Sequence, residues 1–342
     1  MRGLEFFVFS LVDVAQRKAY PLCARQTVRS EAEKAALKAR KKKRTKKTKK
    51  SPAKPSGRPK GSLNKNKKEL KLSPELCRIH ELLKVLMPLI RVFVKVEYVA
   101  LDGHFGHNQA VLLSLQHDLH LISKLRKDAA LYEKAEGEDG GRGRKKKYGK
   151  RLKYDLLPVK YLKKSESAGE IITNYYQGIF LHKEFGAELN VVIIVKINVK
   201  SQKVGHAILF SSDVALSWEK LLDYYSLRFQ IEFNFRDAKQ HFGLEDFMNT
   251  TKTGVENAVN LSFLLVNVSA KLLNQSEEKC VGINDLKSHF RGVKYAVEAI
   301  KILLEKPETV LMKEAIAEVK ERISKLGSIH QPKVAVSTVL LA

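Results

Sequence analysis

The stretch Tyr225-Ser-Leu-Arg228-Phe-Gln-Ile-Glu232, which continues to Lys239, decides the fold class and the candidate chemistry of this chain. Its polar side chains follow the spacing Y-x2-R-x3-E-x6-K. At about 100° per helical residue, they fall within an arc of about 60°, so the spacing predicts one face of a buried helix. Arg228 and Glu232 then form either a structural ion pair within the helix or part of a functional cluster.

The longer stretch Leu221–Glu245, which reads LLDYYSLRFQIEFNFRDAKQHFGLE, resembles the DDE transposases of bacterial insertion sequences, in the branch named for insertion sequence four. We judge the similarity to extend over residues 3–275. It implies a ribonuclease-H-like α/β fold, with a mixed sheet and flanking helices, that cuts and rejoins DNA with two Mg²⁺ or Mn²⁺ ions. It also implies that Glu232 is a catalytic metal ligand and that Tyr225, Arg228 and Lys239 contact DNA.

A second carboxylate, Asp102, follows Val92–Leu101, an apolar stretch that predicts a strand. Residues 108–115 then predict a helix. Carboxylates at the carboxyl ends of strands commonly serve as site residues in α/β folds. The resembled family has its second catalytic Asp in this context, so we expect Asp102 to be a catalytic metal ligand; the structural alternative is a cap on the next helix.

Asp213 and Asp13 are the other candidate carboxylates. Asp213 precedes the predicted helix that leads into Tyr225 and either caps that helix or ligates metal. Asp13 closes the first predicted strand and is expected to belong to a hairpin turn. In the resembled family the first catalytic Asp lies on a strand that precedes residue 4. We therefore expect an N-terminally truncated transposase that binds DNA but cleaves it weakly or not at all.

Positive charge is concentrated in one tract of the sequence. Residues 34–71 contain 18 Lys and Arg and one acid, Glu69, which is +17 of the formal +26 and leaves +9 elsewhere. Such charge indicates a polyanionic partner, here DNA. Within the tract, SGRPKGS at residues 56–62 resembles part of an AT-hook, so Arg58 and Lys60 are candidate minor-groove contacts. A solvated basic linker is the alternative.

These patterns predict a domain order along the chain. We expect the first hairpin of the catalytic domain over 1–30, a disordered basic linker over 31–72, a ribonuclease-H-like core over 73–250 with a basic loop at 136–153, and a C-terminal helical region over 251–342. Within the core, Ser73-Pro74 predicts a helix start. Three β-branched and aromatic runs, 171–181, 190–199 and 204–210, predict strands, and 253–273, 283–304 and 307–325 predict helices.

Several classes of site are disfavoured by the sequence. Three dispersed cysteines form no C-x2-C pair, and the two H-x2-H pairs lack a further ligand at zinc spacing, so structural zinc is not expected. No apolar run reaches the length of a membrane span. We expect a cytoplasmic, nucleoid-associated protein that acts on DNA and can pair as a homodimer. The alternative functions are a non-catalytic DNA-binding protein and a basic nuclease unrelated to transposition.

Overall fold

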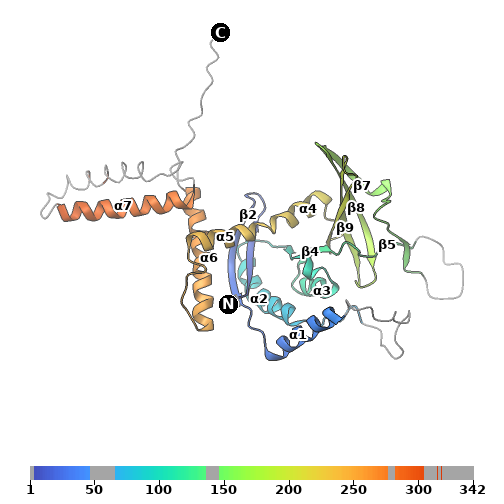
Figure 1. Cartoon of the computed structure of the whole chain (residues 1–342), viewed down its shortest axis with the longest axis horizontal. Coiled ribbons are helices and arrows are strands. Elements are labelled where there is room, and N and C mark those ends of the chain that lie inside the picture. The colour runs from blue at the N-terminus through green and yellow to red at the C-terminus, as the bar shows by residue number, and fades with distance from the viewer. Residues whose placement is uncertain are drawn as a thin grey trace, which may run out of the picture. The chain divides into compact units, whose positions relative to one another are not determined.

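The computed structural model describes residues 4–46, 66–135, 146–275 and 282–303, together with Glu314 and Ala317 (Figure 1). The chain divides into two compact units. We call Lys50–Phe229 the sheet unit, and Met1–Lys49 with Gln230–Ala342 the hairpin–helix unit. The predicted mixed α/β class is confirmed. Among the described residues, no helix is both long enough and apolar enough to cross a membrane.

The sheet unit is built on an eight-stranded sheet with the order β3-β4-β10-β9-β8-β5-β6, and β7 pairs with β8. Only β3 and β4 are parallel; the other pairs are antiparallel. The strands are β3 (Tyr98–Ala100), β4 (His120–Leu125), β5 (Leu131–Lys134), β6 (Tyr148–Arg151), β7 (Leu162–Ala168), β8 (Ile171–His182), β9 (Glu188–Asn198) and β10 (Val204–Ser211). The three strands predicted from β-branched runs are thus confirmed as β8, β9 and β10.

Helices α2 (Pro74–Arg91), α3 (Asn108–Gln116) and α4 (Trp218–Leu227) belong to the sheet unit, with the short 3-10 turns η1 (Gly103–Phe105) and η2 (Val159–Tyr161). Leu221 of α4 is fully buried against Ile122 of β4, Val192 of β9 and Leu209 of β10. Burying such aliphatic side chains stabilises a fold by about 1.5–3 kcal/mol each. This cluster fixes α4, which carries the first half of the signature, on the central strands.

The hairpin–helix unit contains the hairpin of β1 (Phe6–Asp13) and β2 (Lys18–Gln26), with α1 (Glu31–Lys46), α5 (Gln230–His241), α6 (Lys252–Gln275) and α7 (Ile283–Leu303). Helix side chains satisfy the backbone of β2. Asn260 of α6 accepts from the Ala24 amide at 2.8 Å and donates to the Ala24 carbonyl at 2.9 Å. Asn267 of α6 donates to the Pro21 carbonyl at 2.7 Å. β2 is therefore held by helices where a third strand would otherwise pair.

Residues 31–46, which composition predicted to be disordered, form α1. A capping box begins this helix: the Ser30 amide donates to Glu33 Oε2 at 2.8 Å, and the Glu33 amide donates to Ser30 Oγ at 3.2 Å. The alanine-rich first turns favour a helix, and an Asp/Glu-rich start complements its dipole. The prediction of disorder differs from the structure over 31–46 because it rested on the lysine-rich, low-complexity composition and did not weigh these local helix signals. Residues 47–65, which include Arg58 and Lys60, lie outside the described residues.

One predicted strand of the sheet unit is shorter than expected, and one helix begins where predicted. The strand expected over Val92–Leu101 is restricted to Tyr98–Ala100, because only these residues pair with β4. Helix α2 begins where predicted, with Ser73 Oγ accepting from the Leu76 amide at 3.3 Å, but it continues past Pro88 to Arg91. A proline inside a helix forgoes one hydrogen bond and does not always end the helix.

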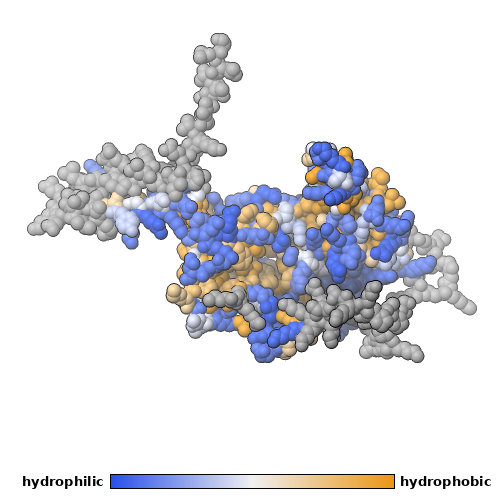
Figure 2. Space-filling view, viewed as in Figure 1, coloured by the Kyte–Doolittle hydropathy of each residue, from blue (hydrophilic) through white to orange (hydrophobic). Residues whose placement is uncertain are grey.

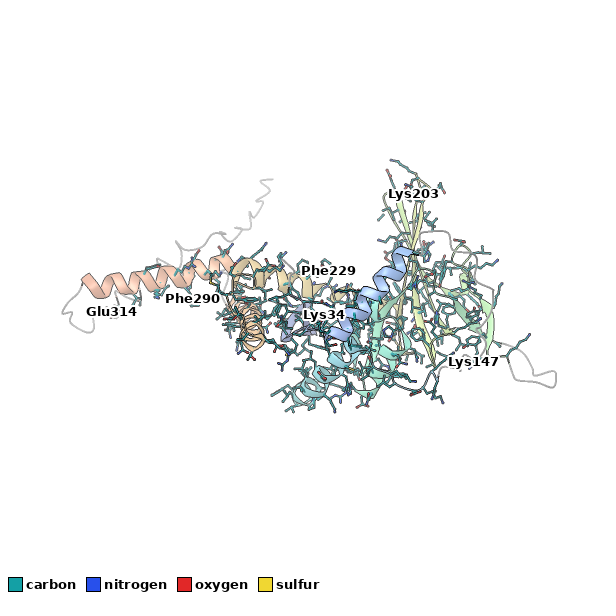
Figure 3. All side chains as sticks on the ribbon, turned by 60° about the horizontal axis from the view of Figure 1, so that its bottom comes forward. Lys34, Lys147, Lys203, Phe229, Phe290 and Glu314 are labelled. Atoms are coloured by element: carbon teal, nitrogen blue, oxygen red, sulfur yellow. The ribbon has the colours of Figure 1, made fainter. Side chains whose placement is uncertain are left out.

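The signature does not lie on one helix, and the predicted single face was wrong. Helix α4 ends at Leu227, α5 begins at Gln230, and the turn at Arg228 and Phe229 separates them (Figure 3). The Phe229 amide donates to the Ser226 carbonyl at 3.1 Å, three residues back, so the helix tightens here and stops. The border between the two units falls at the same place, between Phe229 and Gln230.

The sequence-based domain boundaries did not anticipate this division. The hairpin expected in the catalytic domain and the C-terminal helices form one compact unit with α5. Asn234 of α5 donates to the Ala19 carbonyl at 2.9 Å, and Glu256 of α6 accepts from the Gln26 amide at 3.1 Å. These bonds join segments more than 200 residues apart, and periodicity carries no information about such partners.

Candidate active site

Asp102 lies just after β3, at the carboxyl end of the strand, as predicted. The next strand holds its backbone: the Leu101 amide donates to the Ile122 carbonyl at 3.0 Å, and Ser123 Oγ donates to the Asp102 carbonyl at 3.0 Å. Asp102 is the N-cap residue of η1 by position, but its side chain accepts no capping hydrogen bond. With 64% of its side chain exposed, the carboxylate is available to a ligand.

Gly106 allows the turn that follows Asp102 to lie close against β4. A Cβ at this position would stand 2.2 Å from the Lys124 carbonyl oxygen, which is a backbone clash that cannot be relieved by moving a side chain. Gly106 and Ser123 thus hold the backbone around Asp102 against β4 and so position its carboxylate. The sequence analysis identified neither residue. The available sequence signal was that Gly106 follows Gly103 by three residues. That signal does not predict the close approach of Gly106 to the backbone of β4, because β4 is distant in sequence.

Arg228 is the residue that the structure brings to Asp102. Its Nη2 lies 3.8 Å from Asp102 Oδ1, which makes an ion pair without a hydrogen bond. The guanidinium carbon lies 5.7 Å from the centre of the Tyr225 ring, within the range of a cation–π contact. Burial raises the pKa of Tyr225, while the charge of Arg228 opposes that rise. Three of the predicted site residues therefore form one cluster in the sheet unit.

The Nε atom of Arg228 is buried and has no hydrogen-bond partner among the described residues. Leaving a buried donor without an acceptor costs about 1–3 kcal/mol. An arginine recognises an oxyanion through two parallel N–H groups, commonly with Nε as one of them. The buried Nε–H of Arg228 therefore lacks an acceptor, and the arginine lies next to the exposed carboxylate of Asp102.

Glu232 and Lys239 lie on α5, in the hairpin–helix unit. Glu232 is exposed and makes no hydrogen bond or ion pair with any part of the chain that the structure describes. Arg228 and Glu232 do not share a helix, so the intrahelical ion pair that was one of the two alternatives for them does not apply. Lys239 forms an ion pair with Glu245. Glu232 is thus a second exposed carboxylate with free oxygen ligands.

Comparison with known proteins identifies the family to which this chain belongs. The chain matches the family model described as the transposase DDE domain over residues 78–268, which is more than half of its length. The chain belongs to the transposase DDE family. The match contains Asp102, Tyr225, Arg228, Glu232 and Lys239, whereas Arg58 and Lys60 precede it. A search of curated proteins finds no match.

DDE transposases carry out DNA transposition and typically use divalent metal ions. Such ions prefer hard oxygen ligands, so we ask which carboxylates of this transposase domain are suited to bind one. Asp102 and Glu232 fit, because each is exposed and neither carboxylate is occupied by a hydrogen bond within the described chain. The described residues contain no group of three or more His, Cys, Asp or Glu side chains close enough to share one ion.

The two alternative carboxylates are engaged in local structure. Asp213 Oδ2 accepts from the Tyr98 hydroxyl at 2.7 Å, and its Oδ1 accepts from the Ala215 amide at 2.9 Å. Burial acts to raise the pKa of Asp213, but these hydrogen bonds lower it below its usual value. Asp213 does not cap α4, whose N-cap is Ser217. Asp13 Oδ1 accepts from the Gln16 amide at 3.0 Å, in the expected hairpin turn.

The histidines of the two H-x2-H pairs also have local partners. His104 Nε2 lies 2.9 Å from Glu75 Oε2, and His107 Nδ1 caps α3 by accepting from the Ala110 amide at 3.4 Å. His117 Nε2 lies 2.9 Å from His80 Nδ1, and His120 Nδ1 lies 3.3 Å from Ser212 Oγ. Within the described residues these contacts leave no cluster suited to zinc.

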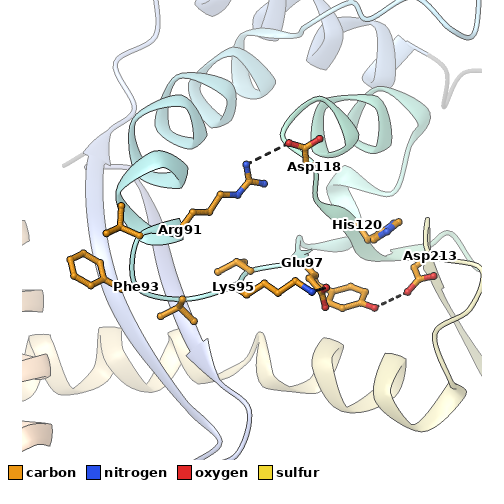
Figure 4. Close-up of a pocket in the computed structure, with 11 residues that line it drawn as sticks. Arg91, Phe93, Lys95, Glu97, Asp118, His120 and Asp213 are labelled. Atoms are coloured by element: carbon orange, nitrogen blue, oxygen red, sulfur yellow. Dashed lines mark hydrogen bonds and ion pairs between the residues drawn. The ribbon is translucent and has the colours of Figure 1, made fainter.

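The sheet unit also contains an open pocket of about 600 Å³ between residues 91–98 and the side chains of Asp118, His120 and Asp213 (Figure 4). Its charged groups are paired: Arg91 with Asp118 at 3.5 Å, and Lys95 with Glu97. Because Asp213 is held by Tyr98 as well, the pocket offers no free pair of carboxylates and is not the candidate metal site.

A basic surface lies at β6, where the predicted loop 136–153 returns to the sheet. Residues 136–145 lie outside the described residues. Lys147 lies just before β6 (Figure 3), and Lys150 and Arg151 lie within it. None of the three forms an ion pair with a described carboxylate. Lys183 Nζ lies 4.9 Å from the centre of the Tyr132 ring on β5. This surface presents several positive charges, of which Lys150 helps to lower the pKa of Glu133.

Proposed function

We propose that this chain acts in DNA transposition through a site made of Asp102 and Glu232 as metal ligands, with Tyr225, Arg228 and Lys239 contacting DNA near the cut. The observation that supports the proposal best is the placement of Arg228. It joins an exposed carboxylate at a strand end, an aromatic ring and an unsatisfied Nε donor in one cluster. The finer assignment to the branch of insertion sequence four rests on the spacing of the signature.

In this proposal, a DNA phosphate supplies the acceptor that Arg228 lacks. Moving the guanidinium onto the phosphate also releases Asp102 from its ion pair, so the carboxylate becomes free to bind a cation. Two Mg²⁺ or Mn²⁺ ions bound to Asp102 and Glu232 would activate the attacking oxygen and stabilise the leaving oxygen of an in-line displacement. Tyr225 can donate a hydrogen bond to the same strand, and Lys239 can neutralise phosphate once it leaves Glu245.

We also propose that the chain alone binds DNA and cleaves it weakly or not at all. The family resemblance assigns three acidic ligands to an intact site, and the 342 residues supply two of them by motif, Asp102 and Glu232. A nicking assay on supercoiled DNA with Mg²⁺ tests this. We expect no turnover above background with wild type. Clear turnover that disappears in Glu232→Gln would contradict the proposed inactivity and establish an intact site.

The second candidate function is a non-catalytic DNA-binding protein, and the basic surface at β6 favours it. Charges without partners bind phosphate and release counterions, so affinity falls steeply with salt. Arg58 and Lys60 would add to this binding. Binding that is unchanged by Glu232→Gln and by removal of Mg²⁺ would favour this function. In either case we expect the protein to act at the nucleoid, with two copies able to pair on two DNA ends.

A further inference from the structure

A cluster of four side chains lies at the β5–β6 end of the sheet, outside the candidate active site. We call Lys67, Tyr132, Tyr148 and Lys183 the tyrosine–lysine patch. The rings of Tyr132 on β5 and Tyr148 on β6 lie 5.5 Å apart, edge to face. Lys183 Nζ lies 4.9 Å from the centre of the Tyr132 ring, and Lys67 Nζ donates to the Tyr148 hydroxyl at 3.4 Å. Figure 2 shows hydrophilic surface around β5, which Figure 1 labels. Two cations are therefore held against two aromatic side chains.

Neither lysine of the patch forms an ion pair with a carboxylate in the part of the chain that the structure describes. Contact with an aromatic ring or a phenol oxygen holds an ammonium group in place without cancelling its charge. Glu184 follows Lys183 in sequence and offsets one charge. Arg151 lies opposite Tyr132 in the β5–β6 ladder and adds a further cation. The patch and its neighbours therefore keep a net positive charge.

A buried amide fixes the two lysines of the patch relative to each other. Asn108, the first residue of α3, is 9% exposed. Its Nδ2 donates to the Lys67 carbonyl at 2.7 Å, and its Oδ1 accepts from the Gly186 amide at 3.0 Å. Gly186 closes the turn between β8 and β9 that begins at Lys183. Asn108 thus ties the backbone of Lys67 to the turn that carries Lys183.

Gln109 attaches the next residues of the basic tract to the same helix. Its Nε2 donates to the Glu69 carbonyl at 3.1 Å, and its Oε1 accepts from the Lys71 amide at 2.6 Å. The basic tract therefore joins the sheet unit at the patch. Residues 47–65, which precede this attachment, contain several lysines and no acidic residue. The sequence thus places further positive charge within a few residues of Lys67.

We propose that the tyrosine–lysine patch binds the phosphate backbone of duplex DNA, and that Asn108 is the positioning residue that holds its two lysines together. The inference deepens the proposed DNA binding and rests on it. Lysine ammonium groups and phenol hydroxyls bond to phosphate oxygens and leave the base edges unread, so binding at the patch is independent of DNA sequence. Each neutralised phosphate releases counterions, so binding weakens as salt rises. The patch thus holds DNA outside the cluster of Asp102 and Arg228.

Fluorescence anisotropy of the full chain with a labelled duplex, at several salt concentrations and without Mg²⁺, tests the patch. We expect the double variant Lys67→Gln/Lys183→Gln to bind at least tenfold more weakly at low salt. The slope of log K against log salt should fall by about two, because two phosphate contacts are lost. The matched control, Lys95→Gln/Lys200→Gln, removes the same charge from two lysines of the sheet unit that already form ion pairs, and should change affinity less than twofold. Equal losses in the two double variants would overturn the proposal.

Combination with Arg228→Gln separates the patch from the candidate active site. If the two places contact different phosphates, their effects on log K add in the triple variant. A triple variant as weak as the double variant, although Arg228→Gln alone weakens binding, would mean one shared contact and would contradict the proposal. Because this binding is measured without Mg²⁺, its outcome does not depend on Asp102 or Glu232. Failure of the proposed metal site would leave the patch standing, and failure of the patch would leave the metal site standing.

A double-mutant cycle tests the positioning role of Asn108. Asn108→Ala removes no charge, but it frees the backbone of Lys67, so we expect binding to weaken about threefold in the wild-type background. In the background of Lys67→Gln/Lys183→Gln we expect no further loss, because no lysine remains to be positioned. Gln109→Ala, at a partly exposed position, is a second variant of the same attachment, and circular dichroism checks that each variant is folded. Equal losses in the two backgrounds, or no loss in the wild-type background, would contradict the positioning role.

Discussion

Arg228 Nη2 stands 3.8 Å from Asp102 Oδ1, although 126 residues separate them in sequence. This pair links the strand-end carboxylate to the signature of the transposase DDE family. At this separation the two charges attract without a hydrogen bond, so either can exchange its partner for a ligand at modest cost. The strand-end Asp102 and the signature residue Arg228 come from two separate motifs, and this contact places them in one candidate site.

Replacing the guanidinium tests its proposed role towards phosphate. We expect Arg228→Gln to weaken DNA binding about tenfold at low salt and to reduce the slope of log K against log salt by about one, because one phosphate contact is lost. Fluorescence anisotropy with a labelled duplex at several salt concentrations measures both quantities.

The matched control for that experiment is Arg126→Gln. Arg126 is 85% exposed and paired with Asp128 at 3.2 Å, outside the candidate site. We expect its removal to change affinity less than twofold. Equal losses in the two variants would mean that Arg228 contributes only general positive charge.

The hydrogen bonds between α6 and β2 make Asn260 a stability determinant. Asn260→Ala would leave both the amide and the carbonyl of Ala24 without partners, and each unsatisfied buried group costs about 1–3 kcal/mol. We expect a loss of about 2–4 kcal/mol in the free energy of unfolding, measured by urea denaturation. Asn257→Ala, on the exposed side of the same helix, should change stability by less than about 0.5 kcal/mol.

The cap of α3 predicts a dependence of stability on pH. Burial is the main cause that lowers the pKa of His107 below 6.5, and His104 lowers it further. Protonation of Nδ1 would also remove the acceptor for the Ala110 amide. The unfolded chain therefore takes up this proton first as the pH falls. The contribution of His107 is complete above a pH of about 6.5 and is lost as the pH falls towards the folded-state pKa.

We expect the melting temperature of wild type to drop between about pH 7 and pH 5, and that of His107→Asn to drop less. Asparagine is a good N-cap residue that does not titrate in this range, so the variant keeps the cap. Differential scanning fluorimetry across this range measures the difference. Parallel curves for the two proteins would show that His107 does not contribute to the acid sensitivity.

The sequence predicted local elements well where the pattern is decided by neighbours. The strands β8, β9 and β10 and the Ser73 cap all follow from nearby residues. The position of Asp102 after a strand was predicted for the same reason.

Prediction failed where distant contacts decide the structure. Residues 228 and 229 contain neither Pro nor Gly, so the break between α4 and α5 has no local signal. Leu227 at the end of α4 is buried in the sheet unit, while Asn234 of α5 bonds to β2 in the hairpin–helix unit. The two helices therefore pack in different units. The contact of Arg228 with Asp102 could be inferred only through the family resemblance.

The central claim is that Asp102 and Glu232 bind the same metal centre. Fe²⁺ can replace Mg²⁺, and with ascorbate and peroxide it generates hydroxyl radicals that cut the backbone next to the bound ion. The account predicts cuts near residue 102 and near residue 232 in the same protein, with both lost in Asp102→Asn and in Glu232→Gln. Cuts near only one of the two positions, or cuts that survive either substitution, would contradict it.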